Sequence, residues 1–264
     1  FKNCQTILNQ EKDGLFDYEI DGLIFTPSNK SVGLEILGKP KKPTKKTWPW
    51  SLKWKPEKFN TIDFLVTTKK LSNGQDFIGN IFQSGENLTQ AEQLSQYKSL
   101  ILRVGFDESR HGFLNPCEDI INEKYLKNND EDRSYRPVPF YPSEPTDKTA
   151  YICNILLQNG ERGAKYLFTE NNQETFEDNM IVEFRYDLIK EDNWRWIPIR
   201  VRYDKTADYR SGGRNYGNAY HVANSNWSSI HNPITPAMIR TGVNIPTHSG
   251  NDDVYYNKGS GESE

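Results

Sequence analysis

The 264-residue chain contains no apolar run that approaches the roughly 18 residues a membrane-spanning helix needs. Its first residues show neither a basic segment nor an apolar core, so we expect no signal peptide. The three cysteines, Cys4, Cys117 and Cys153, are odd in number and far apart. This spacing argues against a disulfide framework and a zinc site and is typical of reduced structural thiols. The sequence therefore predicts a cytosol-like protein without a membrane anchor.

Strong charge of one sign is also missing, because the net charge is only −3. This value argues against a protein that binds polyanions over its whole surface. The exception is a lysine-rich segment between Lys39 and Lys58, in which Glu57 is the one acidic residue. The segment is either a solvated loop or an electrostatic funnel for triphosphates or RNA 5′ ends.

Histidines are few, and the four of them, His111, His221, His231 and His248, are far apart in sequence. No spacing among them is typical of a metal site or a catalytic dyad. We therefore expect each to be a surface or hydrogen-bonded side chain.

Hydrophobic residues make up 35% of the chain and aromatic residues 12%, enough for a globular core. Short apolar, β-branched and aromatic runs predict strands over 18–26, 32–38, 51–55, 60–68, 100–106, 151–157, 180–186 and 194–203. Helical spacing predicts helices over 117–127, 219–230 and 235–241, and four prolines predict a loop over 128–145. The expected class is a β-rich α+β fold, with a small closed β-domain between residues 60 and 205.

Two short runs carry paired cations on extended backbone. Leu52-Lys53-Trp54-Lys55-Pro56 is the first, and the segment from Trp196 to Lys205 is the second. Alternate residues of a strand share a face, so Lys53 and Lys55 point the same way, and so do Arg200 and Arg202. Converging cations on rigid backbone can hold a polyphosphate, and arginine can contact two phosphate oxygens at once.

Together with a third run, Tyr18-Glu19-Ile20-Asp21-Gly22-Leu23-Ile24-Phe25-Thr26-Pro27, these segments resemble motifs of GTP:mRNA guanylyltransferases. These are the capping branch of the covalent nucleotidyltransferases. The arginine run, Trp-x3-Arg-x-Arg-x-Asp-Lys, is the most specific of the three. The segment Asn218–Gly242 resembles the region after the OB domain in large multifunctional viral capping enzymes, such as those of mimivirus-like and African-swine-fever-like viruses.

The resemblance implies a domain order. Residues 1–59 would be the C-terminal part of a nucleotidyltransferase domain, and 60–205 an OB-fold β-barrel. Residues 206–246 would be a short helical segment after the OB fold, and 247–264 a flexible linker.

The resemblance also implies a role for each cation of the first motif. Lys53 and Lys55 would neutralise charge on the α-phosphate of GTP, and both are candidate catalytic residues. Asp21 would contact Mg²⁺ or Mn²⁺, because these ions prefer carboxylate oxygens.

The arginine motif would act on the other end of the triphosphate. Arg200, Arg202 and Lys205 would clamp the β- and γ-phosphates when the OB domain closes. Asp204 would orient the leaving pyrophosphate or its metal. Asp204 and Lys205 complete the candidate catalytic set.

Two motifs of the family are missing. Its nucleophile is the lysine of Lys-x-Asp-Gly, which forms a covalent lysyl–GMP bond. Glu11-Lys12-Asp13-Gly14 is one residue short of that spacing and stands too close to the acidic motif, so Lys12 is a poor candidate. The Asp-Gly-Glu metal motif is also absent. We therefore expect the nucleophile to lie outside this chain and the chain to be inactive alone.

The expected partners are GTP, the 5′ end of RNA, and covalently linked triphosphatase and guanine-N7 methyltransferase domains. The expected location is the cytoplasm of a host cell, or a virion if the protein is viral. Two alternatives stay open. One is a polynucleotide ligase of the same superfamily, which would use ATP rather than GTP. The other is a non-catalytic OB-fold module that binds RNA or serves as a scaffold.

Overall fold

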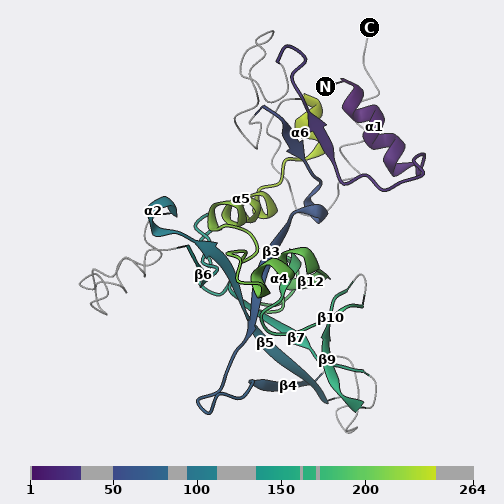
Figure 1. Ribbon diagram of the computed structural model, residues 1–264. Helices are drawn as coiled ribbons and strands as arrows, with labels where there is room; N and C mark the ends of the chain where they lie inside the picture. Colours follow the sequence, from purple (N-terminus) through teal and green to yellow (C-terminus); the bar gives the residue numbers. More distant parts are fainter. Residues whose placement is uncertain are drawn as a thin grey trace. The chain divides into compact units, whose positions relative to one another are not determined.

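The computed structural model describes residues 2–30, 50–82, 94–111, 135–160, 163–170 and 173–241. The chain divides into two compact units (Figure 1). The first unit is Phe1–Phe59 with Asn232–Glu264, and the second unit is Asn60–His231. Most regular structure in the described residues is strand, and helices are short. The predicted β-rich α+β class, with a small helical segment near the C-terminal side, is confirmed.

The first unit combines two helices with a two-stranded sheet. Its elements are α1 (Lys2–Lys12), β1 (Leu23–Phe25), β2 (Leu52–Trp54), the 3-10 turn η1 (Glu57–Phe59) and α6 (Pro236–Thr241). β1 and β2 pair antiparallel, with Leu23 opposite Trp54. Leu8 of α1 packs with these two residues in a small core. The expected strands over 18–26 and 51–55 are therefore present, each shortened to the three residues that find a partner.

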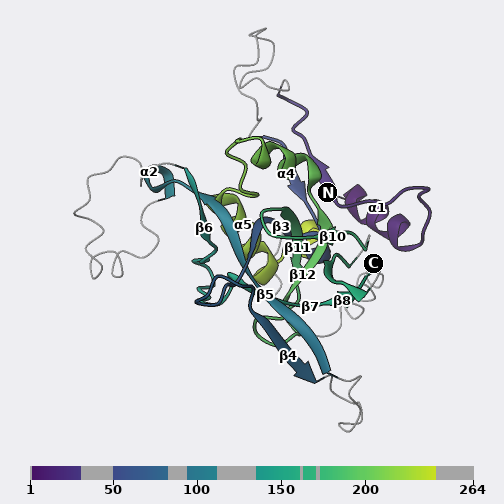
Figure 2. The same ribbon diagram turned by 60° about the horizontal axis from the view of Figure 1, so that its bottom comes forward.

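The second unit contains a curved antiparallel sheet of seven strands and a separate sheet of three strands. Its strands are β3 (Thr61–Thr68), β4 (Ile78–Phe82), β5 (Leu94–Phe106), β6 (Arg136–Pro139), β7 (Ile152–Leu156), β8 (Gln158–Asn159), β9 (Lys165–Phe168), β10 (Thr175–Phe176), β11 (Ile181–Tyr186) and β12 (Trp196–Val201). Its helices are α2 (Glu108–His111), α4 (Tyr203–Arg210) and α5 (Tyr220–His231). The main sheet has the order β12-β11-β3-β5-β4, and β6 and β7 also pair with β5. Strand β5 is the long central strand in both views (Figures 1 and 2).

The sheet curls back on itself. β7 pairs with β5 on one side. On the opposite edge of β7, the Asn154 N–H donates to the carbonyl of Asn193 at 2.6 Å. Asn193 lies shortly before β12 in sequence. The Cys153 thiol donates to the Trp196 carbonyl at 3.3 Å, and burial raises the pKa of this thiol. These bonds connect β7 to β12, so five strands enclose a small barrel whose interior holds the core.

Helix α5 completes that core. Its Trp227 is 1% exposed and donates its indole N–H to the Pro145 carbonyl at 2.8 Å. The Trp227 ring lies 5.9 Å from Trp196 of β12 and 4.8 Å from Tyr186 of β11, measured between ring centroids. The second unit therefore ends at His231, and the expected helical segment 206–246 is divided between the two units. The assignment of residues 1–59 and 60–205 to named domains stays a prediction.

Several expectations were wrong in detail. The predicted loop over 128–145 contains β6, because Arg136–Pro139 pairs with the end of β5. The expected strand over 194–203 ends at Val201, where α4 follows. The predicted strand over 32–38, helix over 117–127 and linker over 247–264 lie outside the described residues.

Candidate functional site

Lys53 and Lys55 converge on a single acceptor in the first unit. The Nζ atoms of Lys53 and Lys55 lie 2.9 and 3.2 Å from Oδ2 of Asp21. Between them, Trp54 points to the other side, where it is 8% exposed and its indole N–H donates to the Ile234 carbonyl at 2.6 Å. The lysines therefore share one side of the segment, and the tryptophan anchors it from the opposite side.

Gly22 allows Asp21 to reach these lysines. Its φ of 144° lies in a region that favours glycine, and a Cβ built there would lie 2.0 Å from the Trp54 carbonyl oxygen. The hydrogen bonds from Lys53 and then Lys55 hold the pKa of Asp21 below its usual value. The three side chains are 33–56% exposed. Exposed pairs of this kind contribute only ~0–1 kcal/mol, so another anion can replace the Asp21 carboxylate.

Asp21 by itself does not fit the predicted metal contact. In the described residues, no group of three or more His, Cys, Asp or Glu side chains could hold a metal ion. One carboxylate oxygen of Asp21 is bound by both ammonium groups, whose charges would repel a cation. The described residues around Asp21 therefore supply at most one carboxylate ligand to a metal ion.

The arginine motif meets two acidic residues that stand side by side on the sheet of the second unit. Asp63 of β3 is opposite Glu183 of β11, and Glu183 is opposite Arg200 of β12. Arg200 Nε donates to Glu183 Oε2 at 2.6 Å. Burial would raise the pKa of Glu183, but the hydrogen bonds from Thr61 and Arg200 outweigh it and lower this pKa.

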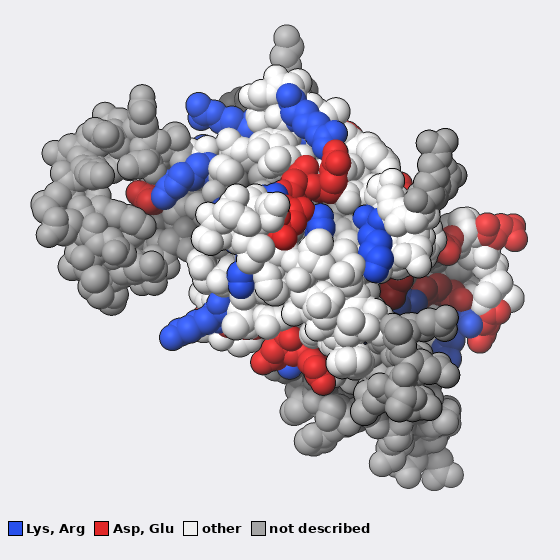
Figure 3. Space-filling view, turned by 90° about the horizontal axis from the view of Figure 1, so that it is seen from below, with Lys and Arg blue, Asp and Glu red and all other residues white. Residues whose placement is uncertain are grey.

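Asp63 binds the other two cations of the motif. Arg202 Nη1 and Lys205 Nζ each lie 2.6 Å from Asp63 Oδ2, and the carboxylate side chain is only 7% exposed. Figure 3 shows basic and acidic side chains side by side over one face of the molecule rather than in a field of one sign.

The expected extended segment from Trp196 to Lys205 is therefore wrong at its end. The Arg202 N–H donates to the Ile181 carbonyl at 2.8 Å, and Thr206 Oγ1 accepts the Ile181 N–H at 2.9 Å. These bonds dock the start of α4 against β11 and place Lys205 in the first turn of a helix. Arg200 and Arg202 consequently bind different carboxylates.

Asp204 lies at the edge of these ion pairs. Its side chain is 71% exposed, and its nearest cationic atom is Arg202 Nε at 3.5 Å. A hydrogen bond from the Lys205 backbone N–H is the main cause that lowers the pKa of Asp204.

Sequence reasoning gave no role to Asp63 or Glu183. A signal was present, because each is an acid within a β-branched and aromatic run that predicts a buried strand. A charge buried in such a strand needs a partner of opposite sign.

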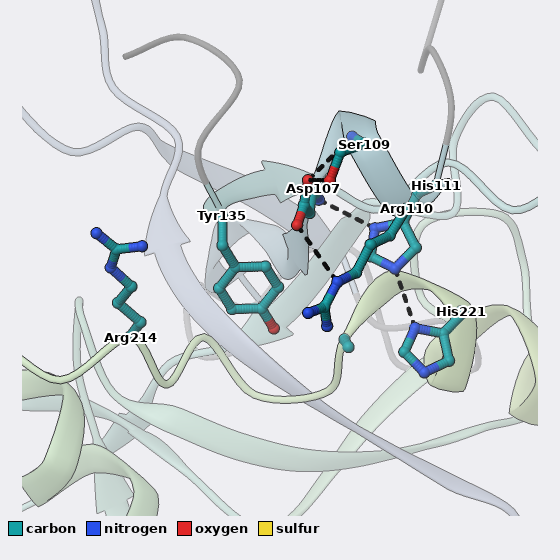
Figure 4. Close-up of a pocket in the computed structure, with 8 residues that line it drawn as sticks. Asp107, Ser109, Arg110, His111, Tyr135, Arg214 and His221 are labelled. Atoms are coloured by element: carbon teal, nitrogen blue, oxygen red, sulfur yellow. Dashed lines mark hydrogen bonds and ion pairs between the residues drawn. The ribbon is translucent and has the colours of Figure 1, made fainter. Parts of the chain in front are cut away.

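A separate cavity of about 470 Å³ lies in the second unit. It is lined by Asp107, Ser109, Arg110, His111, Tyr135, Arg214, Ala219 and His221 (Figure 4). His111 and His221, which are far apart in sequence, meet at this cavity as a hydrogen-bonded pair. Nε2 of His111 lies 3.0 Å from Nδ1 of His221, although 110 residues separate them in sequence.

Comparison with known proteins identifies a relative over most of the chain. No protein-family model matches the chain. The probable mRNA-capping enzyme of Acanthamoeba polyphaga mimivirus is 31% identical over 232 residues, which cover 85% of this chain. The chain spans 16% of the length of that relative. The predicted resemblance to a region of a capping enzyme is confirmed. Among the described helices, none is long and apolar enough to cross a membrane.

Proposed function

We propose that this chain, a region similar to an mRNA-capping enzyme, binds the triphosphate of GTP and assists transfer of GMP to the 5′-diphosphate end of RNA. The observation that carries the proposal is the convergence of Lys53 and Lys55 on one carboxylate oxygen. Two ammonium groups that share one oxygen acceptor can also share one phosphate oxygen. The same resemblance supports an OB fold for the barrel of the second unit.

The reaction has two steps. A lysine amine attacks the α-phosphorus of GTP, loses its proton and forms an N–P bond while pyrophosphate leaves. A terminal oxygen of the RNA diphosphate then attacks the same phosphorus and breaks the N–P bond. Lys53 and Lys55 neutralise charge on the α-phosphate oxygens in both transition states, and Asp21 orients the ammonium groups until the phosphate arrives.

Arg200, Arg202 and Lys205 are assigned to the β- and γ-phosphates, and the exposed Asp204 to the leaving pyrophosphate. Their pairing with Asp63 and Glu183 keeps these cations ordered before GTP binds. Phosphate oxygens must then compete with two carboxylates. A Mg²⁺ or Mn²⁺ ion near Asp21 stays a prediction, and it would need oxygens of GTP as further ligands.

The nucleophile is proposed to lie outside these residues. Lys12 is in the last turn of α1, where the Asp13 N–H donates to the Asn9 carbonyl at 2.9 Å. The Lys12 segment is thus the end of a helix. Linked triphosphatase and methyltransferase domains and a cytoplasmic or virion location belong to the same proposal.

The test uses the intact enzyme with α-labelled GTP and divalent metal, followed by denaturing electrophoresis. We expect Lys53→Ala or Lys55→Ala to reduce the labelled adduct by roughly 10²–10³-fold, the usual cost of one lost transition-state contact. Lys30→Ala is the control, because it removes a lysine of the same unit that lies outside the lysine-rich segment and outside both motifs. Near-wild-type labelling of either variant would contradict the α-phosphate role.

Two further samples separate the alternatives. The 264-residue chain alone should retain no label, and a labelled chain would instead favour Lys12 as the nucleophile. Labelling of the intact enzyme by ATP but not by GTP would favour the ligase. No adduct with either nucleotide would favour the RNA-binding or scaffold module.

A further inference from the structure

The cavity beside α2 is lined by two arginines, Arg110 and Arg214, whose charges are weakly neutralised by the carboxylates of the described residues. Arg110 is 78% exposed, and within the described ranges its ion-pair partner is Asp107, with Oδ2 3.6 Å from Nε. Arg214 is exposed and makes no ion pair with any residue that the structure describes. In the same unit, by contrast, Arg200 and Arg202 lie 2.6 Å from their carboxylates. The cavity therefore presents two guanidinium groups that are open to an anion.

Asp107 is the acidic residue among the described residues that line this cavity, and local hydrogen bonds occupy its carboxylate. Its Oδ1 accepts the Ser109 N–H at 2.9 Å and the Ser109 hydroxyl at 2.6 Å. These bonds from Ser109 hold the pKa of Asp107 below its usual value. The carboxylate thus caps the N-terminus of α2 and pairs only loosely with Arg110.

The histidine pair adds a donor to the cavity. The Asp107 N–H donates to Nδ1 of His111 at 3.0 Å, so the proton of a neutral His111 is on Nε2. That Nε2–H faces Nδ1 of His221 at 3.0 Å, which must accept. The proton of His221 is then on its own Nε2, and this N–H is available to a ligand.

Aromatic rings continue from the cavity along the unit. In the view of Figure 4 the Tyr135 ring lies between Arg214 and Arg110. Tyr216 follows at 5.5 Å from Tyr135, and Tyr209 of α4 at 5.9 Å from Tyr216, between ring centroids. The three tyrosines are partly exposed. They form a row of rings that begins at two open cations.

Arg103 of β5 is a further arginine near these tyrosines that has no close carboxylate in the described part of the chain. Its Nε donates to the Thr67 hydroxyl at 3.2 Å, and no ion pair joins it to a carboxylate of the described residues. Burial lowers the pKa of this guanidinium, and the nearby phenols of Tyr141 and Tyr209 partly offset that effect.

We propose that Arg110 and Arg214, with the rings of Tyr135, Tyr216 and Tyr209, form a binding track for single-stranded RNA. Guanidinium groups bind the phosphates, and bases stack on the tyrosine faces, a combination that suits a flexible single strand. The inference rests on the proposed function only in taking RNA as the substrate. It assigns a single-strand contact to residues of the second unit. A free nucleotide shares this chemistry, so the test must separate the two.

The experiment measures binding of the intact chain to a 3′-fluorescein-labelled single-stranded RNA of about 12 nucleotides by fluorescence anisotropy at several salt concentrations. We expect Arg110→Gln with Arg214→Gln to weaken binding at least ~10-fold. The slope of log K against log salt should also fall by about 1.4, since each lost phosphate contact on a single strand removes about 0.7. The matched control is Lys165→Gln with Lys190→Gln, which removes the same charge from the same unit but leaves the cavity and the three tyrosines unchanged.

A second pair of variants tests stacking. Tyr216→Phe keeps the ring and should bind RNA like the parent chain, whereas Tyr216→Ala should bind about 5-fold more weakly or worse. Thermal unfolding checks that each variant is folded. Unchanged affinity and salt slope in the double arginine variant would overturn the proposal. Equal competition by GTP and unlabelled RNA at equal phosphate concentration would overturn it as well.

Failure of this proposal differs from failure of the proposed function. RNA binding is measured without catalysis, whereas the α-phosphate role is measured by the GMP adduct. Normal RNA binding by the double arginine variant together with loss of adduct in Lys53→Ala would reject only the track. Weakened RNA binding by the double arginine variant together with normal adduct formation in Lys53→Ala would reject only the guanylyl-transfer role.

Discussion

Among single residues, Asp63 combines burial with two ion pairs in the second unit. It is 5% exposed, yet it carries a negative charge between two cations that the sequence assigned to phosphate. Its backbone is also fixed, because the Asp63 N–H donates to Asn218 Oδ1 and its carbonyl accepts the Asn218 N–H, both at 2.8 Å. Removing the carboxylate would leave Arg202 with only the exposed Asp204 at 3.5 Å, and Lys205, which is 23% exposed, without the Asp63 ion pair.

We expect Asp63→Ala to lower the free energy of unfolding by an amount near the low end of ~3–5 kcal/mol, the cost of breaking a buried ion pair. The control is Glu177→Ala, which removes an exposed carboxylate 3.2 Å from Arg210 and should cost ~0–1 kcal/mol. Urea unfolding of both variants measures the difference. Equal losses would show that burial does not strengthen the Asp63 pair.

His111 gives a pH dependence with a definite sign. Burial, and then the charge of His221, lower the pKa of His111 below its ordinary value of 6.5, while Asp107 opposes and Arg110 adds to this shift. As the pH falls through about 6.5, His111 therefore takes up a proton in the unfolded chain before it does so in the folded chain. Stability is fully present above that pH and falls as the pH decreases, until the pH passes below the lowered pKa of the folded state.

We expect the melting temperature to fall between pH 7 and pH 5, and His111→Gln to flatten that part of the curve. If His111→Gln titrates with the parent slope, another group is responsible for the loss of stability.

At the scale of elements, sequence patterns located strands better than they located strand ends. The runs at 60–68 and 180–186 predict β3 and β11 closely, because both strands are buried and β-branched. The arginine motif reads as one extended run, but bonds from Ile181 of a distant strand start α4 at Tyr203. Likewise β6 was hidden by its prolines, and the 13 residues of β5 exceed any local signal because β5 pairs with several strands.

The same limit applies to the candidate site. Alternation predicted that Lys53 and Lys55 share a side, since both belong to one short segment. The carboxylates that hold Arg200 and Arg202 come from strands β11 and β3, and no local pattern pairs them. The His111–His221 contact depends on long-range folding in the same way.

Helix α5 provides a prediction at this scale. The expected domain boundary at 205 would leave α5 outside the barrel, whereas the structure buries Trp227 against β11 and β12. We expect Trp227→Ala to lower the free energy of unfolding by ~3–5 kcal/mol. Trp50→Ala, at a tryptophan that is 46% exposed in the first unit, should cost much less. Similar costs for the two substitutions would mean that α5 does not belong to the core of the barrel.

At the scale of the whole molecule, the cations proposed for GTP are bound to carboxylates in both units. Lys53 and Lys55 bind the exposed Asp21, whereas Arg202 and Lys205 bind the buried Asp63. The first pair can exchange its carboxylate for a phosphate at little cost, because water already screens it. The second set is more firmly held, so its phosphate role and its structural role must be separated by kinetics.

Single-turnover kinetics of the intact enzyme make this separation. If Arg202 and Lys205 bind the β- and γ-phosphates, Arg202→Ala and Lys205→Ala should slow formation of the GMP adduct at least ~100-fold, the cost of one lost electrostatic contact. Transfer from preformed adduct to diphosphate RNA should change less than ~10-fold, because pyrophosphate has already left.

Asp63→Asn is the variant that distinguishes the two roles, because it removes the carboxylate while both cations stay. A phosphate role predicts that Asp63→Asn forms the adduct within ~10-fold of the parent enzyme, even though its melting temperature falls. A purely structural ion pair predicts that all three substitutions lower the melting temperature alike and slow both steps equally. That second pattern would contradict the phosphate contact, since only a group that touches the β- or γ-phosphate can act in the first step and not in the second.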